Sequence, residues 1–457
     1  MPTIAEQLAS YATNLHYRDI PPETVHLAKR MLIDTLACAL GGYHSVPSQI
    51  ARDMAATVTS TQPCTVIGSG QTTSPDLATF ANGVMIRYLD YNDGYTSKES
   101  GHPSDSLAAV LTTAELARAS GKRALAATVL AYEAFCRICD AGDLKPYFDH
   151  VTVGCIASVL GAARALRLTQ AQTLQALNLG IAPNLALYQT RIGDVSMWKG
   201  CAYANASRNA VFATLLAQRG LTGPSPVFEG HGGYIHTVHR GPFALEPFGG
   251  NGHPFKIAEC SIKRFPLGQY SQTVVQAALE IREHLPDVHD IAEVTIETLQ
   301  PAINIMAGDA EKWHPTNRET ADHSMPYTTA VALTYGTINA GHFADAYLHN
   351  QDLLALTGKV KVRVSEAANR RAPEAMLCKM EVVTHAGQRY TSEVAYHKGH
   401  YKNPLTDTEL EEKFHALAGT VLSPVRANAL LERLWHLEDV ADMGEVVKLT
   451  KMETRAA

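Results

Sequence analysis

The hydrophobic pattern of the chain changes near residue 225, and this change constrains the fold more than any other feature. Before it, apolar residues recur at the spacing of one buried helical face. The clearest case begins at Pro21-Pro22-Glu23 and ends at Gly41-Gly42, residues that suit the two ends of a helix. Small residues are frequent here and let helices approach closely. We therefore predict a multi-helix bundle, with further helices over residues 106–119, 123–135, 153–166, 170–182 and 205–219.

A different pattern follows a glycine-rich stretch that runs from Gly230 to Gly252. After one helix predicted over 269–284, four segments alternate apolar and polar residues, as half-buried strands do. Ala386-Gly387 is expected to join the last two as a hairpin. The strands are predicted over 294–298, 359–364, 379–384 and 389–396, with helices between them over 327–340 and 345–356. This alternation indicates a small α+β domain.

The chain returns to a helical pattern after Pro404. Thr408 and Glu411 have the spacing of a capping box. Two amphipathic segments, 410–418 and 425–437, are expected to pack on the first helical region. The predicted fold is mainly α, with a large all-helical domain and a smaller α+β lid domain. The predicted boundaries are 1–265 and 401–457 for the discontinuous helical domain, and 266–400 for the lid domain.

Charge and hydropathy argue against two classes of partner. Lysine and arginine number 39 against 45 aspartate and glutamate, which gives a net charge of −6. An acidic balance without basic runs argues against binding to nucleic acid. No apolar run approaches the roughly 18–20 residues of a membrane span, so no membrane association is expected. An anionic small molecule stays compatible with this balance, because one local basic pocket suffices to bind it.

The eight cysteines are scattered, and the first residues lack the charged and apolar stretches of a signal peptide. Free thiols in the cytoplasm are the simplest interpretation. Cys136 and Cys139 form a single CxxC pair within a helical apolar pattern, which favours core thiols over a zinc or iron–sulfur site. Dinucleotide, P-loop and His-Glu-x-x-His motifs are missing from the sequence.

The most informative polar segment is Asp90-Tyr91-Asn92-Asp93, which is followed closely by His102. A histidine beside carboxylates titrates near neutral pH and can move protons. His102 is expected in a loop at the start of a helix. Capping of helices by Asp93 and Ser104 explains the same residues about equally well.

Three further segments carry charges that could bind an anion. Asp149-His150 precedes a predicted helix, where an anion or a proton could be held, although a plain surface loop is favoured on this pattern alone. Lys199 begins a small-residue helix and is a candidate partner for a carboxylate, although lysines are usually solvated. Lys263-Arg264 forms a compact basic spot, for which anion binding and simple surface charge are equally good interpretations.

A fifth segment, Asp322-His323-Ser324, precedes an apolar helix. No Gly-x-Ser-x-Gly elbow surrounds Ser324, so we interpret the segment as a helix start, near a site or purely structural. Taken together, these groups lie in loops of a helical scaffold that lacks a cofactor motif. Such an arrangement suits proton transfer next to a carboxylate, with lysine and arginine stabilising the developing charge.

Four of these motifs, in this order and spacing, resemble those of the MmgE/PrpD family over nearly the whole chain. They are Leu89-Asp90-Tyr91-Asn92-Asp93, Gly101-His102-Pro103-Ser104, Lys263-Arg264-Phe265-Pro266 and Asp322-His323-Ser324-Met325-Pro326-Tyr327. The family comprises 2-methylcitrate dehydratases, cis-aconitate decarboxylases and iminodisuccinate epimerases. The resemblance implies a small polycarboxylate substrate, no metal or organic cofactor, a homodimer, and a site between a helical domain and a lid.

The resemblance also implies roles for individual residues. Asp90, His102 and His150 match the active-site acid and the proton-transfer residues of the family. Its substrate-binding residues are matched by Lys199 and Lys263, to which we add two neighbouring charged residues, Asp93 and Arg264. The leading expectation is a cofactor-independent hydro-lyase that dehydrates 2-methylcitrate or a closely related tricarboxylate.

Two departures bear on the reaction. The decarboxylase branch carries threonine after its paired acids and an active-site tyrosine after the first lid strand. Gly94 occupies the first position here, and the stretch 299–304 contains no tyrosine. Dehydration is therefore favoured, and an epimerase or decarboxylase of a similar acid is the alternative. Two other classes stay open, an iron–sulfur aconitase-type enzyme and a non-catalytic polycarboxylate binder.

Overall fold

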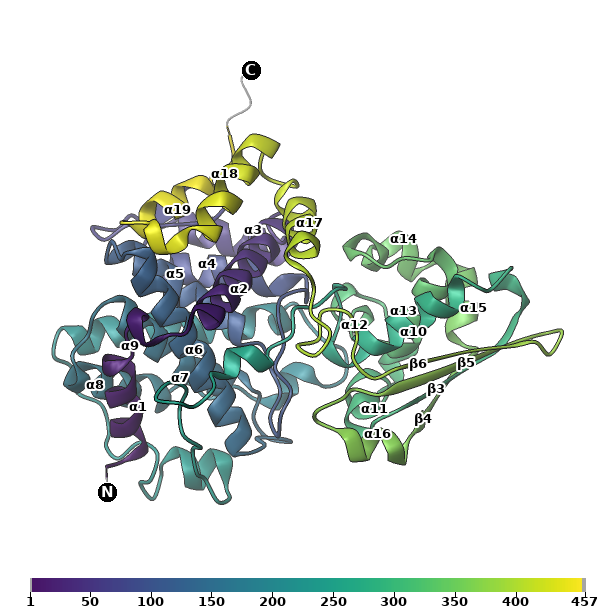
Figure 1. Ribbon diagram of the computed structural model, residues 1–457, viewed down its shortest axis with the longest axis horizontal. Coiled ribbons are helices and arrows are strands. Elements are labelled where there is room, and N and C mark those ends of the chain that lie inside the picture. Colours follow the sequence, from purple (N-terminus) through teal and green to yellow (C-terminus); the bar gives the residue numbers. More distant parts are fainter. Residues whose placement is uncertain (1, 454–457) are drawn as a thin grey trace. The chain divides into compact units, whose positions relative to one another are not determined.

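The computed structural model describes residues 2–453, which divide into two compact units (Figure 1). The first unit comprises the chain up to Tyr188, Gly200–Cys260 and the chain from Thr406 onward. The second comprises Gln189–Lys199 and Ser261–Leu405. The fold is mainly α with a smaller α+β part, as predicted. No helix within residues 2–453 is long and apolar enough to cross a membrane.

The first unit is a bundle of helices with a short two-stranded ribbon. Its helices are α1 (Ile4–Asn14), α2 (Pro22–Gly41), α3 (Val46–Ala56), α4 (Pro75–Tyr88), α5 (Leu107–Leu116), α6 (Gly121–Ala141), α7 (Val151–Ala165), α8 (Gln170–Ile181), α9 (Trp198–Gln218), α17 (Asp407–Ala418), α18 (Pro424–Trp435) and α19 (Met443–Leu449). The ribbon pairs β1 (Cys64–Thr65) with β2 (Thr72–Thr73) in antiparallel fashion.

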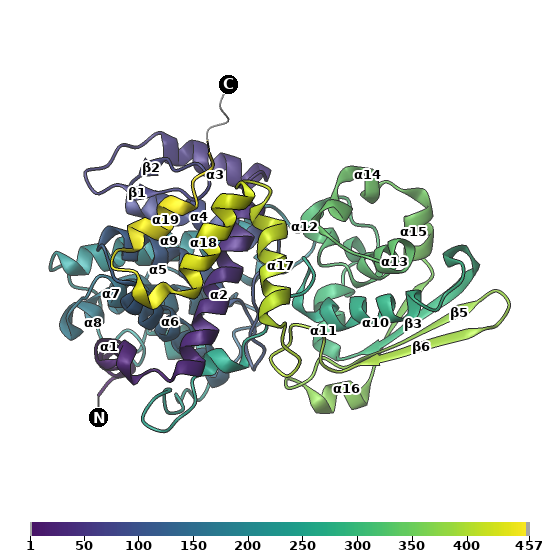
Figure 2. The same cartoon turned by 45° about the horizontal axis from the view of Figure 1, so that its top comes forward.

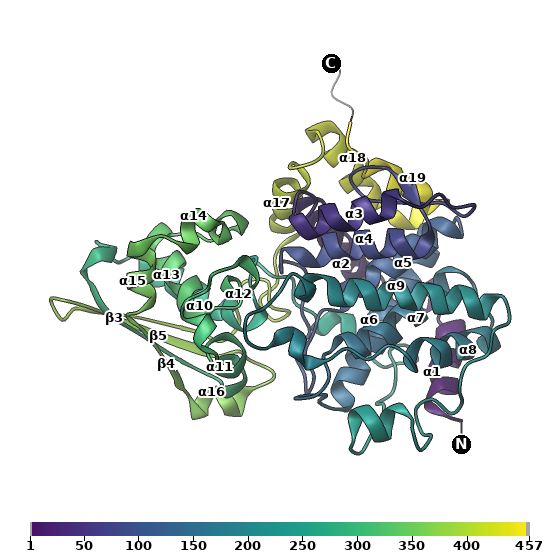
Figure 3. The same cartoon turned by 180° about the vertical axis from the view of Figure 1, so that it is seen from behind.

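Small residues let these helices pack closely, as the sequence predicted. On α7, a Cβ atom added to Gly161 would lie 2.6 Å from Val110 of α5 and 3.3 Å from Ala131 of α6. Helices α5, α6 and α7 therefore meet where a larger side chain would not fit. On the other side of α5, helix α4 packs between α5 and α3 (Figure 3).

The C-terminal helices complete the first unit: α17 and α18 pack on α2, and α19 packs on α5 (Figure 2). The Nζ of Lys413 on α17 lies 2.6 Å from a carboxylate oxygen of Asp34 on α2, and both side chains are buried. The capping box of α17 was misplaced by two residues in the sequence analysis. Thr406 and Glu409 form it, because the helix begins at Asp407.

The second unit is built around a four-stranded sheet in the order β4-β3-β5-β6. Strand β3 is parallel to β4 and antiparallel to β5, and β5 and β6 form the predicted hairpin. The strands are β3 (Ile291–Thr298), β4 (Val360–Val364), β5 (Cys378–Thr384) and β6 (Arg389–Val394). The helices are α10 (Gln272–Arg282), α11 (Gln300–Met306), α12 (Arg318–Ala321), α13 (Met325–Tyr335), α14 (Asp345–Leu348), α15 (Gln351–Thr357) and α16 (Glu366–Arg371).

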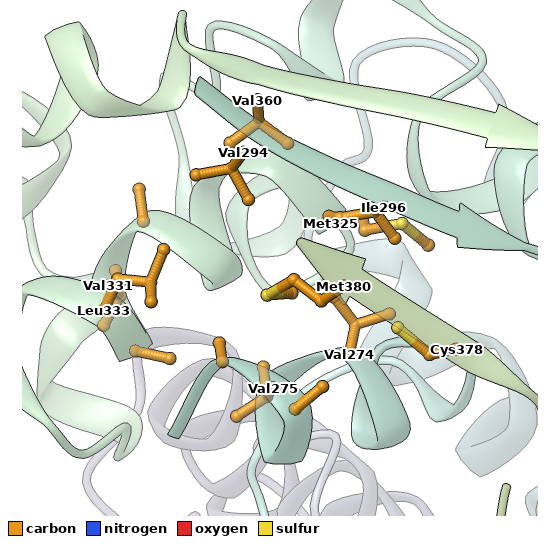
Figure 4. Close-up of a cluster of buried hydrophobic side chains, with 14 of the residues drawn as sticks. Val274, Val275, Val294, Ile296, Met325, Val331, Leu333, Val360, Cys378 and Met380 are labelled. Atoms are coloured by element: carbon orange, nitrogen blue, oxygen red, sulfur yellow. The ribbon is translucent and has the colours of Figure 1, made fainter. Parts of the chain in front are cut away.

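The core of this unit lies between the sheet and two helices (Figure 4). Val294, Ile296 and Met380 project from the strands toward Val274 of α10 and Val331 of α13. These side chains are fully buried, and each contributes roughly 1.5–3 kcal/mol by leaving water. The alternating pattern in the sequence thus has a structural cause: the apolar residues point to the face of the sheet that the helices cover.

Three predicted helix spans in this unit need correction. The helix expected over 269–284 starts as a 3₁₀ turn, and its α-helical part is α10. The helix expected over 327–340 ends at Tyr335, because Gly336 adopts a left-handed conformation at its C-terminal cap. The helix expected over 345–356 is two helices, since Asn350 caps a new one by accepting a hydrogen bond from the Leu353 amide.

The division of the chain differs from the predicted boundaries at three places. Residues 189–199 were assigned to the helical domain, but they belong to the second unit. The amide of Gly193 donates to Asp309, and Asp194 accepts from Asn317 and Thr320. Residues 261–265 and 401–405 also belong to the second unit, which fits the hydrogen bond from the Ile262 amide to the Gly399 carbonyl.

Candidate active site

A buried arginine, Arg87, organises a polar cluster in the first unit. It stands in the last turn of α4 and is only 1 % exposed. Its Nη1 lies 2.8 Å from Asp90 Oδ1, its Nε 3.4 Å from Asp105 Oδ2, and its Nη2 3.1 Å from His102 Nε2. Two buried carboxylates thus neutralise the charge of one buried guanidinium. This pairing reduces the free-energy cost of placing these charges in the interior.

A short loop presents His102 to this cluster. Two backbone hydrogen bonds between Tyr95 and Gly101, of 2.8 and 3.0 Å, close the loop just before the histidine. The Nδ1 of His102 lies 2.6 Å from the carbonyl oxygen of Asp93. A carbonyl only accepts and an arginine only donates, so Nδ1 carries the proton and Nε2 presents its lone pair. The contacts therefore hold His102 as a neutral imidazole with a basic Nε2.

Asp90 has a left-handed backbone, with φ of +51°. This conformation is uncommon outside glycine, although aspartate tolerates it better than most residues. The ion pair with Arg87 holds the carboxylate of Asp90 in a fully buried position at the end of α4. Backbone conformations of this kind cluster at functional sites.

Asp93 is also fully buried, and its environment raises its pKa. Loss of hydration raises the pKa of this carboxyl to about 6, against the opposing effect of the hydrogen bonds from Ser104. Both the amide and the hydroxyl of Ser104 donate to Oδ1, at 3.2 and 2.5 Å. Asn92 donates to the Ser104 hydroxyl and to Asp105, so the motif is one continuous network. Asp93 and Ser104 bond each other rather than capping helices independently.

A second histidine, His150, stands at the N-terminal cap of α7 beside His102. The two ring centroids are 5.5 Å apart, at an interplanar angle of 72°. Asp149, almost fully buried, holds His150 Nδ1 at 2.8 Å. A Cβ atom added to Gly101 would lie 2.6 Å from the His150 ring, so only glycine permits this approach. Both histidines are therefore fixed through Nδ1.

In the second unit, Lys199 is buried among polar groups. Its Nζ lies 2.5 Å from Asp322 Oδ1, 3.2 Å from His323 Nδ1 and 3.2 Å from the Glu319 carbonyl. Asp322 also holds His323 at 2.6 Å. The segment Asp322-His323-Ser324, which the sequence analysis interpreted as a helix start, thus also contacts Lys199. Ser324 caps α13, while Asp322 and His323 contact the lysine.

A buried lysine that the sequence analysis did not select, Lys312, lies near Lys199. Burial lowers the pKa of Lys312, and the charge of Lys199 lowers it further. Within residues 2–453 its ammonium makes no ion pair or side-chain hydrogen bond, although it is only 1 % exposed. Two buried ammonium groups close together attract a multiply charged anion.

Lys263 lies in a different environment, near His397. It is fully buried, and its charge contributes to lowering the pKa of His397. Burial is the main cause and brings the His397 pKa to about 4, while that of His400 falls to about 3 through burial and the neighbouring His397. Both rings are therefore neutral at neutral pH. Arg264, by contrast, is exposed, with its guanidinium over the Phe265 ring.

Sequence models of a known family match both units. The MmgE/PrpD N-terminal domain matches residues 6–246, and the MmgE/PrpD C-terminal domain matches residues 265–437. The chain belongs to the MmgE/PrpD family.

This chain is similar to members of the MmgE/PrpD family that are named for their activities. Human cis-aconitate decarboxylase is 25% identical over 98% of this chain and 95% of its own. The 2-methylcitrate dehydratase of Cupriavidus necator is 29% identical over 73% of this chain and 72% of its own. That of Escherichia coli strain K12 is 30% identical over 72% and 71%. Dehydratases and decarboxylases are lyases, and this MmgE/PrpD protein is an enzyme of that class.

The structure distributes the predicted site residues of this MmgE/PrpD protein over its two units. Asp90, Asp93, His102 and His150 come together in the first unit. The lysines and Arg264 lie in the second unit, where Lys199 and Lys263 have separate surroundings. The sequence analysis did not select four buried residues that contact or crowd these groups: Arg87, Asp105, Lys312 and His397.

Proposed function

We propose that this lyase dehydrates 2-methylcitrate or a closely related tricarboxylate by acid–base proton transfer, without a metal or an organic cofactor. The observation that carries the proposal is the pair His102 and His150. Their rings lie 5.5 Å apart, and each has its Nδ1 held by an oxygen acceptor. Two imidazoles held in this way can serve as the base and the acid of one elimination.

The proposed reaction removes water from adjacent carbons. One histidine Nε2 takes the proton from the carbon next to a carboxylate, and the electron pair of that C–H bond becomes the new C=C bond. The other histidine, which has already taken a proton from solvent on its Nε2, gives that proton to the leaving hydroxyl as the C–O bond breaks, and water departs. The proposal leaves open which ring is the base. Asp149 orients His150 through Nδ1, whereas Arg87 and the Asp93 carbonyl orient His102.

Substrate binding is assigned to the cations of the second unit, with Asp93 as a polar partner. A tricarboxylate carries about three negative charges, and buried ammonium groups stabilise the extra charge that develops when the proton leaves. Lys199 and Lys263 are both at most 2 % exposed, so their charges act with little screening. Arg264 is exposed, and we assign it to an outer carboxylate. Asp90 keeps Arg87 in place through their 2.8 Å ion pair.

The alternative is an epimerase or decarboxylase of a similar polycarboxylate. The match to human cis-aconitate decarboxylase over 98% of this chain supports it. Gly94 and the stretch 299–304, which lacks tyrosine, weigh against decarboxylation of cis-aconitate. Proton removal next to a carboxylate is common to the three reactions, so the same pair of histidines would serve each of them.

An NMR time course in D2O tests the proposal. The enzyme is first treated with a chelator and then given 2-methylcitrate, citrate, cis-aconitate or iminodisuccinate in separate samples. Loss of water from 2-methylcitrate or citrate supports the dehydratase. Release of CO2, or exchange at a stereocentre without elimination, assigns the alternative. An absorption spectrum of the active protein tests the iron–sulfur alternative, because a cluster would colour the protein brown. Turnover of any substrate excludes a non-catalytic binder.

A further inference from the structure

The first unit holds a second charged region, a cavity of about 670 Å³. It lies among the end of α1, the 3₁₀ turn Tyr17–Asp19, the start of α6 and the end of α7. Its lining includes five cationic side chains: Arg18, Lys122, Arg123, Arg164 and Arg167. None of the residues around Arg87 lines it, and no aspartate or glutamate is among its lining residues.

The cavity is separate from the histidine pair, because the two lie at opposite ends of α7. His150 caps the first turn of this helix, while Arg164 stands in its last turn. A helix of 15 residues is about 22 Å long at 1.5 Å per residue. The cationic cavity is therefore a different site from the proposed catalytic centre, and the inference does not rest on the proposed function.

The two partly buried arginines of the cavity are held by neutral groups, whereas the exposed Arg18 lies 3.6 Å from the carboxylate of Asp19. Arg164 donates from Nε to the Leu15 carbonyl at 2.9 Å and contacts His16 through Nη2. Arg123 donates to the Ala117 carbonyl at 3.4 Å, and its buried Nε has no hydrogen-bond partner in the described chain. Within residues 2–453, neither arginine forms an ion pair, and the same holds for Lys122 and Arg167. Their charges are therefore not offset by carboxylates.

Two further features make the cavity positive. Burial and the charges of Arg167 and Arg164 lower the pKa of Arg123 to about 10, which shows how closely the guanidinium groups crowd one another. The N-terminus of the 21-residue helix α6 opens into the same space, and its N-cap residue Ser120 makes no side-chain cap hydrogen bond. The Gly121, Arg123 and Ala124 amides of this helix donate to backbone carbonyls, so its contribution to anion attraction comes mainly from the helix dipole.

We propose that this cavity binds a small polyanion that carries several phosphate or carboxylate groups. Guanidinium groups match both chemistries with paired hydrogen bonds. The volume fits a molecule of nucleotide or tricarboxylate size, since small-molecule sites span roughly 300–1,000 Å³. Such a ligand offsets the repulsion among the arginines, and this makes the empty cavity the less stable state. The presence of four cations without an ion pair in the described residues, in a chain of net charge −6, is otherwise unexplained.

Calorimetric titration at constant ionic strength tests the proposal, with sodium tripolyphosphate and citrate as separate probes. The variants are Arg123→Gln and Arg167→Gln, and the matched control is Arg219→Gln, an exposed helix-end arginine outside the cavity. We expect the wild type and the control to bind at least one probe. Each cavity variant should bind it at least tenfold more weakly, because each removes one guanidinium from the site. Preference for tripolyphosphate assigns phosphate chemistry, and preference for citrate assigns carboxylate chemistry.

Thermal unfolding without added anion gives a second readout that does not depend on ligand identity. Relief of like-charge repulsion predicts that Arg167→Gln melts no lower than the wild type, and that tripolyphosphate or citrate raises the midpoint of the wild type more than that of the variant. Absence of binding by the wild type at millimolar concentrations of both probes overturns the proposal. Equal affinity in the wild type and in both cavity variants overturns it as well.

Discussion

The two histidine pairs of this protein differ in the charged groups that surround them. In the first unit, His150 contacts the buried carboxylate of Asp149, and His102 contacts Arg87, which is itself paired with Asp90 and Asp105. In the second unit, His397 and His400 are buried near Lys263 and Lys402, and their pKa values fall to about 4 and 3. The comparison shows that the surroundings of a histidine decide its protonation behaviour. We propose that the first pair moves protons, whereas burial keeps the second pair neutral.

The largest effect is expected from breaking the first pair. His102→Asn should lower kcat on the preferred substrate by about 10³-fold, because general acid–base catalysis contributes roughly 10²–10⁴-fold. The measurement is the steady-state rate of water loss, compared with His284→Asn, which replaces an exposed histidine. Full activity of His102→Asn would refute the assignment of proton transfer to this residue.

The next effect concerns stability between pH 4 and 6.5, where the two units should respond in opposite directions. The folded-state pKa of Asp93 is raised to about 6, so its contribution to stability falls as pH rises from about 4 to 6. The folded-state pKa of His397 is lowered to about 4, so its contribution falls as pH drops from 6.5 to 4. Each shift corresponds to about 3 kcal/mol at most.

Chemical denaturation at several pH values separates these two contributions. Asp93→Asn should remove the component of unfolding free energy that declines toward pH 6, and His397→Gln should remove the component that declines toward pH 4. The slope with pH is the readout, so a uniform loss of stability in either variant does not affect the result. Unchanged slopes in both variants would contradict the burial assigned to these groups.

A smaller effect tests how closely His150 is positioned. Gly101→Ala places a methyl group 2.6 Å from the His150 ring and 2.8 Å from Phe135, so the ring must move. We expect kcat to fall about tenfold and the free energy of unfolding to fall by about 1–3 kcal/mol. Gly232→Ala is the control, because a Cβ atom there meets nothing within 4 Å. Equal rates for the two variants would show that the ring position is not critical.

The smallest effect is expected at Lys312, which sharpens the comparison for the second unit. Lys312→Met should raise KM several-fold with little change in kcat, because it removes a cation that attracts the substrate without removing a proton-transfer group. The same variant should be no less stable than the wild type, since it relieves repulsion with Lys199. A fall in kcat at constant KM would assign Lys312 to the chemical step.

Periodicity in the sequence was sufficient to predict the layers of the fold, but the ends of elements depended on caps. Gly336 ends α13 and Asn350 starts α15, whereas the apolar pattern continues through both points. The segment 189–199 was misassigned because hydrogen bonds, rather than hydrophobic periodicity, hold it to the second unit. Long-range polar contacts of this kind leave no periodic trace in a sequence.

The site was predictable where its residues stand in compact motifs. Asp90, Asp93 and His102 lie within 13 positions of each other and do meet in space. Arg87 was missed because it closes a helix that had not been predicted, where an arginine resembles an ordinary solvated cation. Lys312 and His397 were missed because their burial follows from the packing of distant segments. One signal for His397 was present in the sequence. It stands three residues before His400, and Gly399 between them lies against the backbone of Ile262.

The ion pair between Lys413 and Asp34 has a consequence for synthesis of the chain. Both groups are buried, and 379 residues separate them along the sequence, from 34 to 413. At roughly 5–20 residues per second, Asp34 emerges from the ribosome on the order of tens of seconds before its counter-charge. During that time α2 lacks both the ammonium and the covering surface of α17. The unit whose synthesis begins first is therefore completed last. A chain that ends before residue 407 lacks α17, so the face of α2 that α17 covers is left exposed.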